Sequence, residues 1–484
     1  MFSYMGVGVV SDLTTPTINI YEIFDNEGLV IGLTLPEVRA KGKGLMINLK
    51  PTDESLLVEN GIATVSLPTL LSIAGGCSYK AEEINDLFQK TVGIDFNHIF
   101  MGENEIDFSI LFNSERFWRK IAGLVQESMD IVQENGLMKF LLLEIKVTPI
   151  LHHMFDGGYP LDVQGVKQEC QKLQEFLVEV NEKIKITQGD LAELYYLRSK
   201  IEDKMRRIPY GCFNTKKKII TIFCNFRSIG SDTFRITTNR VNIQGMPKVI
   251  RNSLLPRHGD VLVEYDLVGS QLIILACLSG EESLIRLYAN GEDLYLYIVS
   301  IMTGKEMCSV TKSDRKVYKK SILQMLYGAG IETIKTELTA NGIIVSYGDV
   351  ENMRKQFYQS FPAIKKYSDR IKRTDCVTLP DGRKWNLRNT VEPFKVLAHI
   401  LQYVESVVLR ETLVLLNRKI RNKKIWFYLS IHDSVILEAS SEEYVKLGKI
   451  VRQCFSHVAK KYLHGLEQIN VKEEIIYNET RKIR

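Results

Sequence analysis

The stretch from Val261 to Gly280 constrains the fold of this chain most strongly, because a short strand runs directly into an apolar helix. Residues 261–265 alternate as a strand does, and the apolar run from Leu272 to Leu278 is too long and too poor in charge for a surface segment. Asp266 lies between them, on a rigid edge where a carboxylate can hold a metal ion. An Asp in front of a helix more often serves as the helix N-cap.

A similar construction recurs at Ile425 to Glu438, where two apolar runs flank the polar tip His432-Asp433-Ser434. The pattern predicts a β-hairpin. Its turn lacks the Gly or Asn that hairpin geometry alone would select. The polar tip therefore favours a functional role over simple turn chemistry.

Residues 313–328, between these two segments, predict a helix with a mixed basic and aromatic stripe. Arg315, Lys319, Leu323 and Tyr327 recur every four residues, which places them along one helix face. An amphipathic surface helix is the simpler interpretation. Like charges at this spacing repel mildly, however, so the stripe favours an anion such as a triphosphate between the two cations.

These three segments, in this order, resemble the three signature motifs of the family A (polymerase I type) DNA polymerases. Asp266 matches the first metal-binding aspartate, residues 315–328 match the nucleotide-binding helix of the fingers, and His432-Asp433 match the tip of the palm hairpin. The resemblance implies a compact, diverged family member of the α+β class. Its fold would be a right-hand polymerase of palm, fingers and thumb, preceded by a small α/β N-terminal domain.

The resemblance also implies a set of site residues. The expected catalytic residues are Asp266, Asp433 and Lys319, and the expected metal ligands are Asp266, Leu267 and Asp433. The expected nucleotide-binding residues are Arg315, Lys319, Leu323, Tyr327, Gln271 and Tyr295. The expected DNA-binding residues are Arg235, Asn242, Gln244, Arg251, Gln402 and His432. Arg and Gln side chains suit the minor-groove acceptors that all base pairs share.

The activity implied by this resemblance is template-directed addition of deoxynucleotides to a primer 3′ end by two-metal nucleotidyl transfer. The implied cofactor is Mg²⁺, with two ions bound and Mn²⁺ as a substitute. The implied partners are template-primer DNA and deoxynucleoside triphosphates.

Four positions depart from the family pattern. The usual Glu five residues after the metal aspartate is Gln271, a fingers aromatic is Leu323, a His is Tyr295, and the acidic residue after His-Asp is Ser434. The two metal aspartates and the phosphate-binding cations are retained, so we expect an active enzyme with altered substrate discrimination. Gln271 should still block a ribose 2′-hydroxyl by its volume, with a weaker hydrogen bond to Tyr327 than a glutamate would form.

Charge divides the chain into two parts. Residues 1–130 contain 9 Lys and Arg against 18 Asp and Glu, a balance of −9, whereas residues 131–484 contain 54 against 40, a balance of +14. The basic part predicts the nucleic-acid surface. The acidic part predicts an accessory domain that could bind a protein partner.

The acidic part has the pattern of short strands, at residues 6–10, 18–23, 29–35 and 45–49, with a helix expected at Lys80 to Lys90. Polymerase I relatives often carry a proofreading exonuclease in this position, and its two metals need clustered carboxylates. Asp12 is followed by Leu13 and Thr14, so Asp12 does not begin an Asp-x-Glu pair. We therefore expect a degenerate exonuclease-like or unrelated domain without proofreading activity.

The expected domain order follows from the helical pattern that begins near Glu115 and from the positions of the motifs. It places the accessory domain at 1–130, the thumb at 131–232, the first part of the palm at 233–284, the fingers at 285–375 and the second part of the palm at 376–484.

Composition is that of an ordinary soluble protein and adds little else. The chain of 484 residues is 45% hydrophobic and 25% charged, has no apolar run long enough to span a membrane, and lacks the charged start of a signal peptide. Its eight cysteines are scattered without a CxxC pair. We expect no membrane association and a cytoplasmic or other reducing compartment.

Two other functions compete with a DNA polymerase. A single-subunit RNA polymerase would share the palm, the cationic stripe and a His-Asp-Ser tip. The segment Asn242 to Pro247 and the spacing after Asp266 favour the DNA enzymes. A nucleic-acid-binding accessory protein with a vestigial palm is the third alternative.

Overall fold

A computed structural model describes residues 4–10, 17–22, 29–34, 44–48, 57–59, 62–75, 115–187, 192–213, 215–239, 241–386 and 395–479. The chain forms two compact units. The first contains Met1–His153, Ser228–Arg235 and Asp381–Trp385, and the second contains Met154–Arg227, Ile236–Pro380 and Asn386–Arg484. Within the described residues, no helix combines the length and the apolar character needed to cross a membrane.

The first unit is built on a five-stranded mixed sheet with the order β3-β2-β1-β4-β5. Its strands are β1 (Tyr4–Val10), β2 (Thr17–Glu22), β3 (Leu29–Thr34), β4 (Gly44–Asn48) and β5 (Thr64–Ser66). β1 pairs with β2 and β2 with β3 in the antiparallel sense, whereas β1–β4 and β4–β5 are parallel. The strands predicted at the start of the chain are therefore confirmed, and the apolar residues of β4 are fully buried.

Helices α3 (Leu67–Gly75), α7 (Glu115–Glu134) and most of α8 (Met138–Asp156) complete this unit. The boundary expected at residue 130 falls inside α7, and the compact unit continues to His153. Residue 130 divides the acidic part of the sequence from the basic part, but the apolar face of α7 continues past it. A helix packs by its apolar face, so the compact unit continues as well. Asp12 and the helix expected at Lys80 to Lys90 lie outside the described residues.

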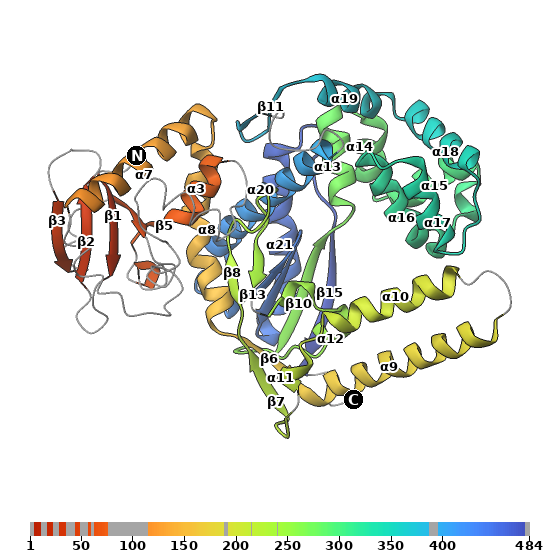
Figure 1. Ribbon diagram of the computed structural model, residues 1–484, viewed down its shortest axis with the longest axis horizontal. Helices are drawn as coiled ribbons and strands as arrows, with labels where there is room; N and C mark the ends of the chain where they lie inside the picture. Colours follow the sequence, from red (N-terminus) through yellow and green to blue (C-terminus); the bar gives the residue numbers. More distant parts are fainter. Residues whose placement is uncertain are drawn as a thin grey trace. The chain divides into compact units, whose positions relative to one another are not determined.

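The second unit contains an antiparallel sheet with the order β13-β14-β10-β15 (Figure 1). Its strands are β10 (Val261–Leu267), β13 (Ile425–Ile431), β14 (Ser434–Ala439) and β15 (Val471–Asn478). β10 pairs with β14 on one side and with β15 on the other, which explains why its residues are almost all buried. Helix α21 (Ser441–Tyr462) packs on this sheet and on α20 (Val396–Ile420), and α20 also contacts α13 (Ser270–Ser279). The predicted strand, apolar helix and hairpin are confirmed.

Two long antiparallel helices, α9 (Val163–Ile186) and α10 (Ala192–Arg206), lie beside each other in this unit (Figure 1). Asp162 caps α9, because its side chain accepts a hydrogen bond from the Gln164 N–H at 3.0 Å. The shorter elements between α8 and β10 are α11 (Tyr210–Phe213), β6 (Tyr159–Asp162) paired with β7 (Ile219–Ile222), β8 (Asn225–Arg227) paired with β9 (Thr237–Asn239), η1 (Ile243–Gly245) and α12 (Lys248–Arg251).

A cluster of helices separates α13 from α20 in sequence. It consists of α14 (Glu282–Ala289), α15 (Leu294–Thr303), η2 (Met307–Ser309), α16 (Lys312–Leu326), α17 (Ile331–Thr339), α18 (Tyr347–Ser360) and α19 (Pro362–Arg373). The predicted fingers helix is α16, which starts at a capping box between Thr311 and Asp314. Strands β11 (Cys376–Thr378) and β12 (Lys384–Asn386) follow, and Gly382 between them has a φ of 96°, as a tight turn requires. The α+β fold class is confirmed.

Candidate active site

The strand register of the second unit brings the two predicted metal aspartates together. Asp266, near the end of β10, is directly opposite Ser434, the first residue of β14. Asp433 precedes Ser434 in a two-residue hairpin turn, since Ile431 pairs with Ser434. The other turn residue, His432, has a φ of 52°, a left-handed conformation that costs a non-glycine residue about 1–2 kcal/mol. Strain at this turn supports a functional role for the tip.

The charged neighbours of Asp266 change its pKa. Burial, followed by the nearby Asp433 and Glu264 carboxylates, raises the pKa of Asp266 to about 7. Lys319 of α16 and Lys472 of β15 act in the opposite direction. Lys472 is the cross-strand neighbour of Asp266 in β15. Two carboxylates this close favour a cation between them.

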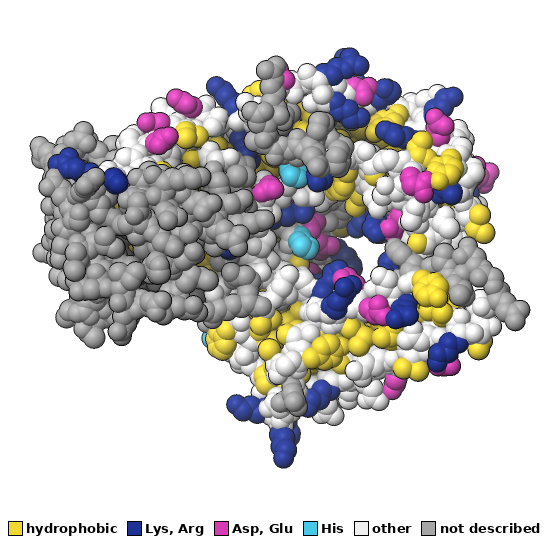
Figure 2. Space-filling model, in the orientation of Figure 1, with side chains coloured by type: hydrophobic (Ala, Val, Ile, Leu, Met, Phe, Trp, Pro, Cys, Tyr) yellow, Lys and Arg dark blue, Asp and Glu magenta, His cyan; other side chains and the backbone are white. Residues whose placement is uncertain are grey.

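A polar cavity of about 190 Å³ opens at this point, and Figure 2 shows acidic, basic and histidine side chains around the hollowed part of the unit. Its lining residues are Lys248, Arg251, Glu264, Asp266, Ile431, His432, Asp433, Ser434, Lys472 and Glu474. Glu264 is held by the Ser434 hydroxyl, which donates to Oε1 at 2.9 Å, and by Arg251 at 3.6 Å. The predicted residues Arg251 and His432 are therefore part of the same cavity as the two aspartates.

The donor set suits a hard divalent cation. Among the described residues, no group of three or more His, Cys, Asp or Glu side chains is arranged to hold a metal ion. Mg²⁺ characteristically takes one or two protein carboxylates and completes its shell with water and substrate phosphates. Asp266 and Asp433 fit that pattern. Leu267 could add only its backbone carbonyl, because its hydrocarbon side chain has no ligand atom.

The predicted stripe of α16 faces the same region. Arg315, Lys319 and Leu323 lie in the helix, and Tyr327 is its C-cap residue. Arg315 forms an ion pair with Asp293, which also caps α15. The buried ring of Tyr295 lies 5.3 Å from both the Arg315 guanidinium carbon and the Lys319 ammonium. A cation–π cluster therefore fixes the direction of the two basic side chains.

Gln271 makes a different contact from the one predicted. Its amide Nε2 donates to Glu405 Oε2 at 3.4 Å, and Glu405 lies on α20. The neighbouring Ser270 hydroxyl is 2.6 Å from Glu405 Oε1 and 2.8 Å from Asp433 Oδ2. The Gln271 amide, which was expected to bond to Tyr327, is thus directed toward the buried Glu405 carboxylate.

The predicted DNA contacts divide into several groups. Gln244 is buried, and its amide donates to the Ser430 carbonyl at 2.7 Å and to the Ile236 carbonyl at 3.3 Å. Both amide hydrogens are therefore directed to backbone carbonyls in this structure, and a contact of Gln244 with the minor groove stays a prediction. Asn242 is exposed, and its side-chain oxygen caps η1 by accepting from the Gly245 N–H at 2.9 Å.

The remaining two predicted DNA-binding residues, Gln402 and Arg235, are not among the residues that line the cavity. Gln402 is half-buried in the middle of α20. Arg235 belongs to the first compact unit. Their contacts with DNA stay predictions.

The residues of the site that were missed from the sequence include Glu264, Ser270, Glu405 and Lys472. Glu264 could have been found, because it is two residues before Asp266 and a strand repeats its faces every two residues. The others meet the site only through strand pairing and helix packing.

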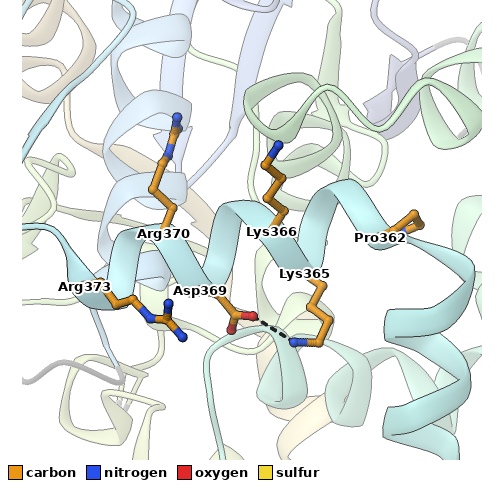
Figure 3. A pocket seen from close by; sticks show the side chains of 6 residues that line it. All are labelled: Pro362, Lys365, Lys366, Asp369, Arg370 and Arg373. Atoms are coloured by element: carbon orange, nitrogen blue, oxygen red, sulfur yellow. Dashed lines mark hydrogen bonds and ion pairs between the residues drawn. The ribbon is translucent and has the colours of Figure 1, made fainter.

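Helix α19 carries a second charged surface. Its apolar residues Ile364, Tyr367 and Ile371 are buried. The opposite face forms a shallow groove lined by Pro362, Lys365, Lys366, Asp369, Arg370 and Arg373, as Figure 3 shows. Asp369 is paired with Lys365 at 2.8 Å, so the groove has a net positive charge.

Residues 119–475 match the sequence family described as DNA polymerase family A. DNA polymerase I of Aquifex aeolicus (strain VF5) is 22% identical over 290 residues, which cover 58% of this chain and 48% of that protein. DNA polymerase I of Caldicellulosiruptor bescii is 21% identical over 509 residues, which cover 90% of this chain and 58% of that protein. The chain thus spans about half the length of these relatives.

The fold is similar to that of the POL domain of Pol1 from M. smegmatis, solved in complex with DNA primer-template and dNTP. The TM-score is 0.71 at 14% sequence identity, and the match covers 99% of this chain and 96% of that chain. The family match extends over most of the sequence and includes every predicted site residue. The chain therefore belongs to DNA polymerase family A.

Proposed function

We propose that this chain is a template-directed DNA polymerase that adds deoxynucleotides to a primer 3′ end. One observation carries the proposal: the β10–β14 register places Asp266 beside Asp433, with Lys319 of α16 close enough to offset part of the rise in the pKa of Asp266. A carboxylate pair facing a cationic helix is suited to phosphoryl transfer, in which positioning and charge stabilisation do most of the work.

Asp266 and Asp433, with the Leu267 carbonyl, would hold the divalent cations. Two Mg²⁺ ions, or Mn²⁺ in their place, would lower the pKa of the primer 3′-hydroxyl and neutralise the triphosphate. Lys319 contacts the phosphates and protonates the departing pyrophosphate, and Arg315 binds the γ-phosphate. Tyr327 packs near the base and sugar.

Three other groups line the nucleotide site. Leu323 gives the α16 face an apolar patch for the base. Tyr295 orients both α16 cations through its ring. Gln271 occupies the space beside the sugar.

The proposed partners are template-primer DNA and deoxynucleoside triphosphates. The Pol1 domain from M. smegmatis was solved with such ligands, and the basic balance of residues 131–484 supports a DNA partner here. We assign the thumb to α9 and α10, the fingers to α14–α19, and the palm to the β13-β14-β10-β15 sheet with its helices. Asn242, Arg251, Gln402 and His432 are the proposed DNA contacts from the palm.

A gel assay of primer extension tests the proposal, with template-primer, Mg²⁺ and either deoxy- or ribonucleotides. We expect deoxynucleotide addition that Asp266→Asn and Asp433→Asn each abolish while DNA binding is nearly retained. The matched control is Asp260→Asn, because Asp260 lies beside the same sheet and its carboxylate accepts hydrogen bonds from Ser441 at the start of α21. Activity in both active-site variants would refute the metal assignment.

The same assay separates the alternatives. Ribonucleotide addition from a promoter without a primer would indicate an RNA polymerase. DNA binding without any nucleotide addition would indicate an accessory protein with a vestigial palm.

Proofreading is proposed to be absent, because Asp12 is followed by Leu13 and Thr14 and does not begin an Asp-x-Glu pair. The purified protein should leave a mismatched 3′ end intact over the time needed for extension. Trimming that is lost in Asp12→Ala would contradict this. The use of the first unit as a site for a protein partner stays a prediction from its acidic balance.

A further inference from the structure

Glu405 is a buried carboxyl group that the polymerase motifs do not account for. It lies on the buried face of α20 and is only 1% exposed. A carboxylate at that depth is costly unless hydrogen bonds compensate for the lost water. Both of its oxygens reach the first turn of α13, where Oε1 meets Ser270 Oγ at 2.6 Å and Oε2 meets Gln271 Nε2 at 3.4 Å.

The contact between Glu405 and the first turn of α13 lies next to Asp433. Ser270 Oγ is also 2.8 Å from Asp433 Oδ2, so one hydroxyl bridges Glu405 and a proposed metal ligand. On the other side, Tyr295 packs against the turn that begins α13, since a Cβ on Gly269 would lie 3.8 Å from its ring. The Glu405 carboxyl therefore lies behind the residues that line the nucleotide site.

The two ends of the Gln271 amide are in different environments. A carboxylate only accepts hydrogen bonds, so Glu405 requires the Nε2 end of the amide to face it. The Oε1 end is buried and has no hydrogen-bond partner among the described residues. A buried acceptor without a donor calls for a partner, and a water or a ligand group could supply one.

We infer that Glu405 is a positioning residue for sugar selection, which holds Gln271 with its amide oxygen and its bulk turned toward the sugar of the incoming nucleotide. The carboxylate that holds the Gln271 amide is supplied from α20, behind the glutamine. The inference rests on the proposed polymerase function and goes beyond it. Glu405 sets the preference for deoxyribose over ribose through Gln271 and touches no reacting atom.

Exchanging the side chains of Gln271 and Glu405, singly and together, tests this inference. In Gln271→Glu, two carboxylates face each other, and the side chain is no longer held. In Glu405→Gln, the new amide can bind a reversed Gln271 amide, which then presents its NH₂ to the sugar. Each single variant should lower the ratio of kcat/KM for a deoxynucleotide to that for the matched ribonucleotide by about tenfold, the value of one hydrogen bond.

The double variant, Gln271→Glu combined with Glu405→Gln, restores a donor facing a carboxylate. Its ratio should return to within about twofold of the parent. A role of Glu405 in folding alone would not be repaired by a change at Gln271. The matched control is Glu411→Gln on the same helix, whose half-buried carboxylate pairs with Lys461 and should leave the ratio unchanged.

The outcomes are distinguishable. Extension by the parent with an unchanged ratio in both single variants overturns this inference and leaves the polymerase function intact. Loss of discrimination without recovery in the double variant also overturns it. Absence of any primer extension by the parent overturns the proposed function, and this inference with it. If Glu405→Gln fails to fold, Gln271→Glu and the double variant still decide the result.

Discussion

Replacing Asp266 by Asn should stabilise the metal-free protein, and the gain should increase with pH. The folded pKa of Asp266 is about 7, raised first by burial and then by Asp433 and Glu264, against an ordinary value of 3.8. Between these values the folded carboxyl keeps its proton and the unfolded one has lost it. Stability therefore falls as the pH rises from about 4 to 7, by up to about 1.4 kcal/mol per pH unit.

The size of the effect follows from the two pKa values. The penalty for Asp266 is about 1.7 kcal/mol at pH 5 and about 4 kcal/mol at pH 8, so the gain in Asp266→Asn should increase by about 2–3 kcal/mol over this range. Added Mg²⁺ should stabilise the parent at pH 8 more than the variant, because a ligand that binds only the folded state adds to stability.

Urea unfolding in EDTA at pH 5, 6, 7 and 8 measures this difference. Trp426 lies on β13, so its fluorescence reports the second unit once Trp118 and Trp385 are replaced by Phe. Asp260→Asn is the control of opposite sign, since hydrogen bonds from the Ser441 N–H and hydroxyl hold the pKa of Asp260 below its ordinary value. Its loss of stability should be the same at pH 5 and pH 8. A gain in Asp266→Asn that does not increase with pH would refute the reasoning.

Lys319→Ala should lower kcat/KM for the nucleotide by at least about 100-fold and leave the Kd for template-primer nearly unchanged, because its charge is proposed to face the triphosphate. A fall in duplex affinity alone would make α16 a DNA-binding face. The double change Lys366→Ala with Arg370→Ala removes two positive charges from the α19 groove. It should weaken binding of a primer with a long template overhang and reduce the slope of log affinity against log salt concentration by about 1–2, since each phosphate contact releases counterions. Lys365→Ala with Asp369→Ala removes an ion pair from the same helix without changing its net charge and should leave the slope as it is.

Local sequence patterns predicted the elements that carry the chemistry. The alternation before Asp266, the apolar run after it, and the two apolar runs around His432-Asp433 each involve residues close in sequence. The same holds for the four-residue spacing of α16, from Arg315 to Tyr327. Side-chain periodicity of a helix or a strand is a property of the backbone, so these elements can be recognised without knowing what they pack against.

Domain limits and the contacts of polar side chains were harder to predict from the sequence. The change of net charge at residue 130 suggested a boundary, but α7 continues through it to Glu134. Gln244 has an amide group that suits the DNA minor groove, yet its amide hydrogens bind the Ser430 and Ile236 carbonyls. A polar side chain bonds to whichever acceptor the fold places nearby, and the sequence does not name that acceptor.

The sequence by itself determined the strand, the hairpin and the cationic helix, and through them the two aspartates and Lys319. The tertiary structure alone decided that Asp266 is opposite Ser434, that Lys472 flanks it from β15, and that Glu405 reaches Gln271 from α20. Antiparallel register and helix packing are fixed by contacts between segments more than a hundred residues apart. Such contacts leave no periodic trace in either segment, because each depends on the complementary surface of the other.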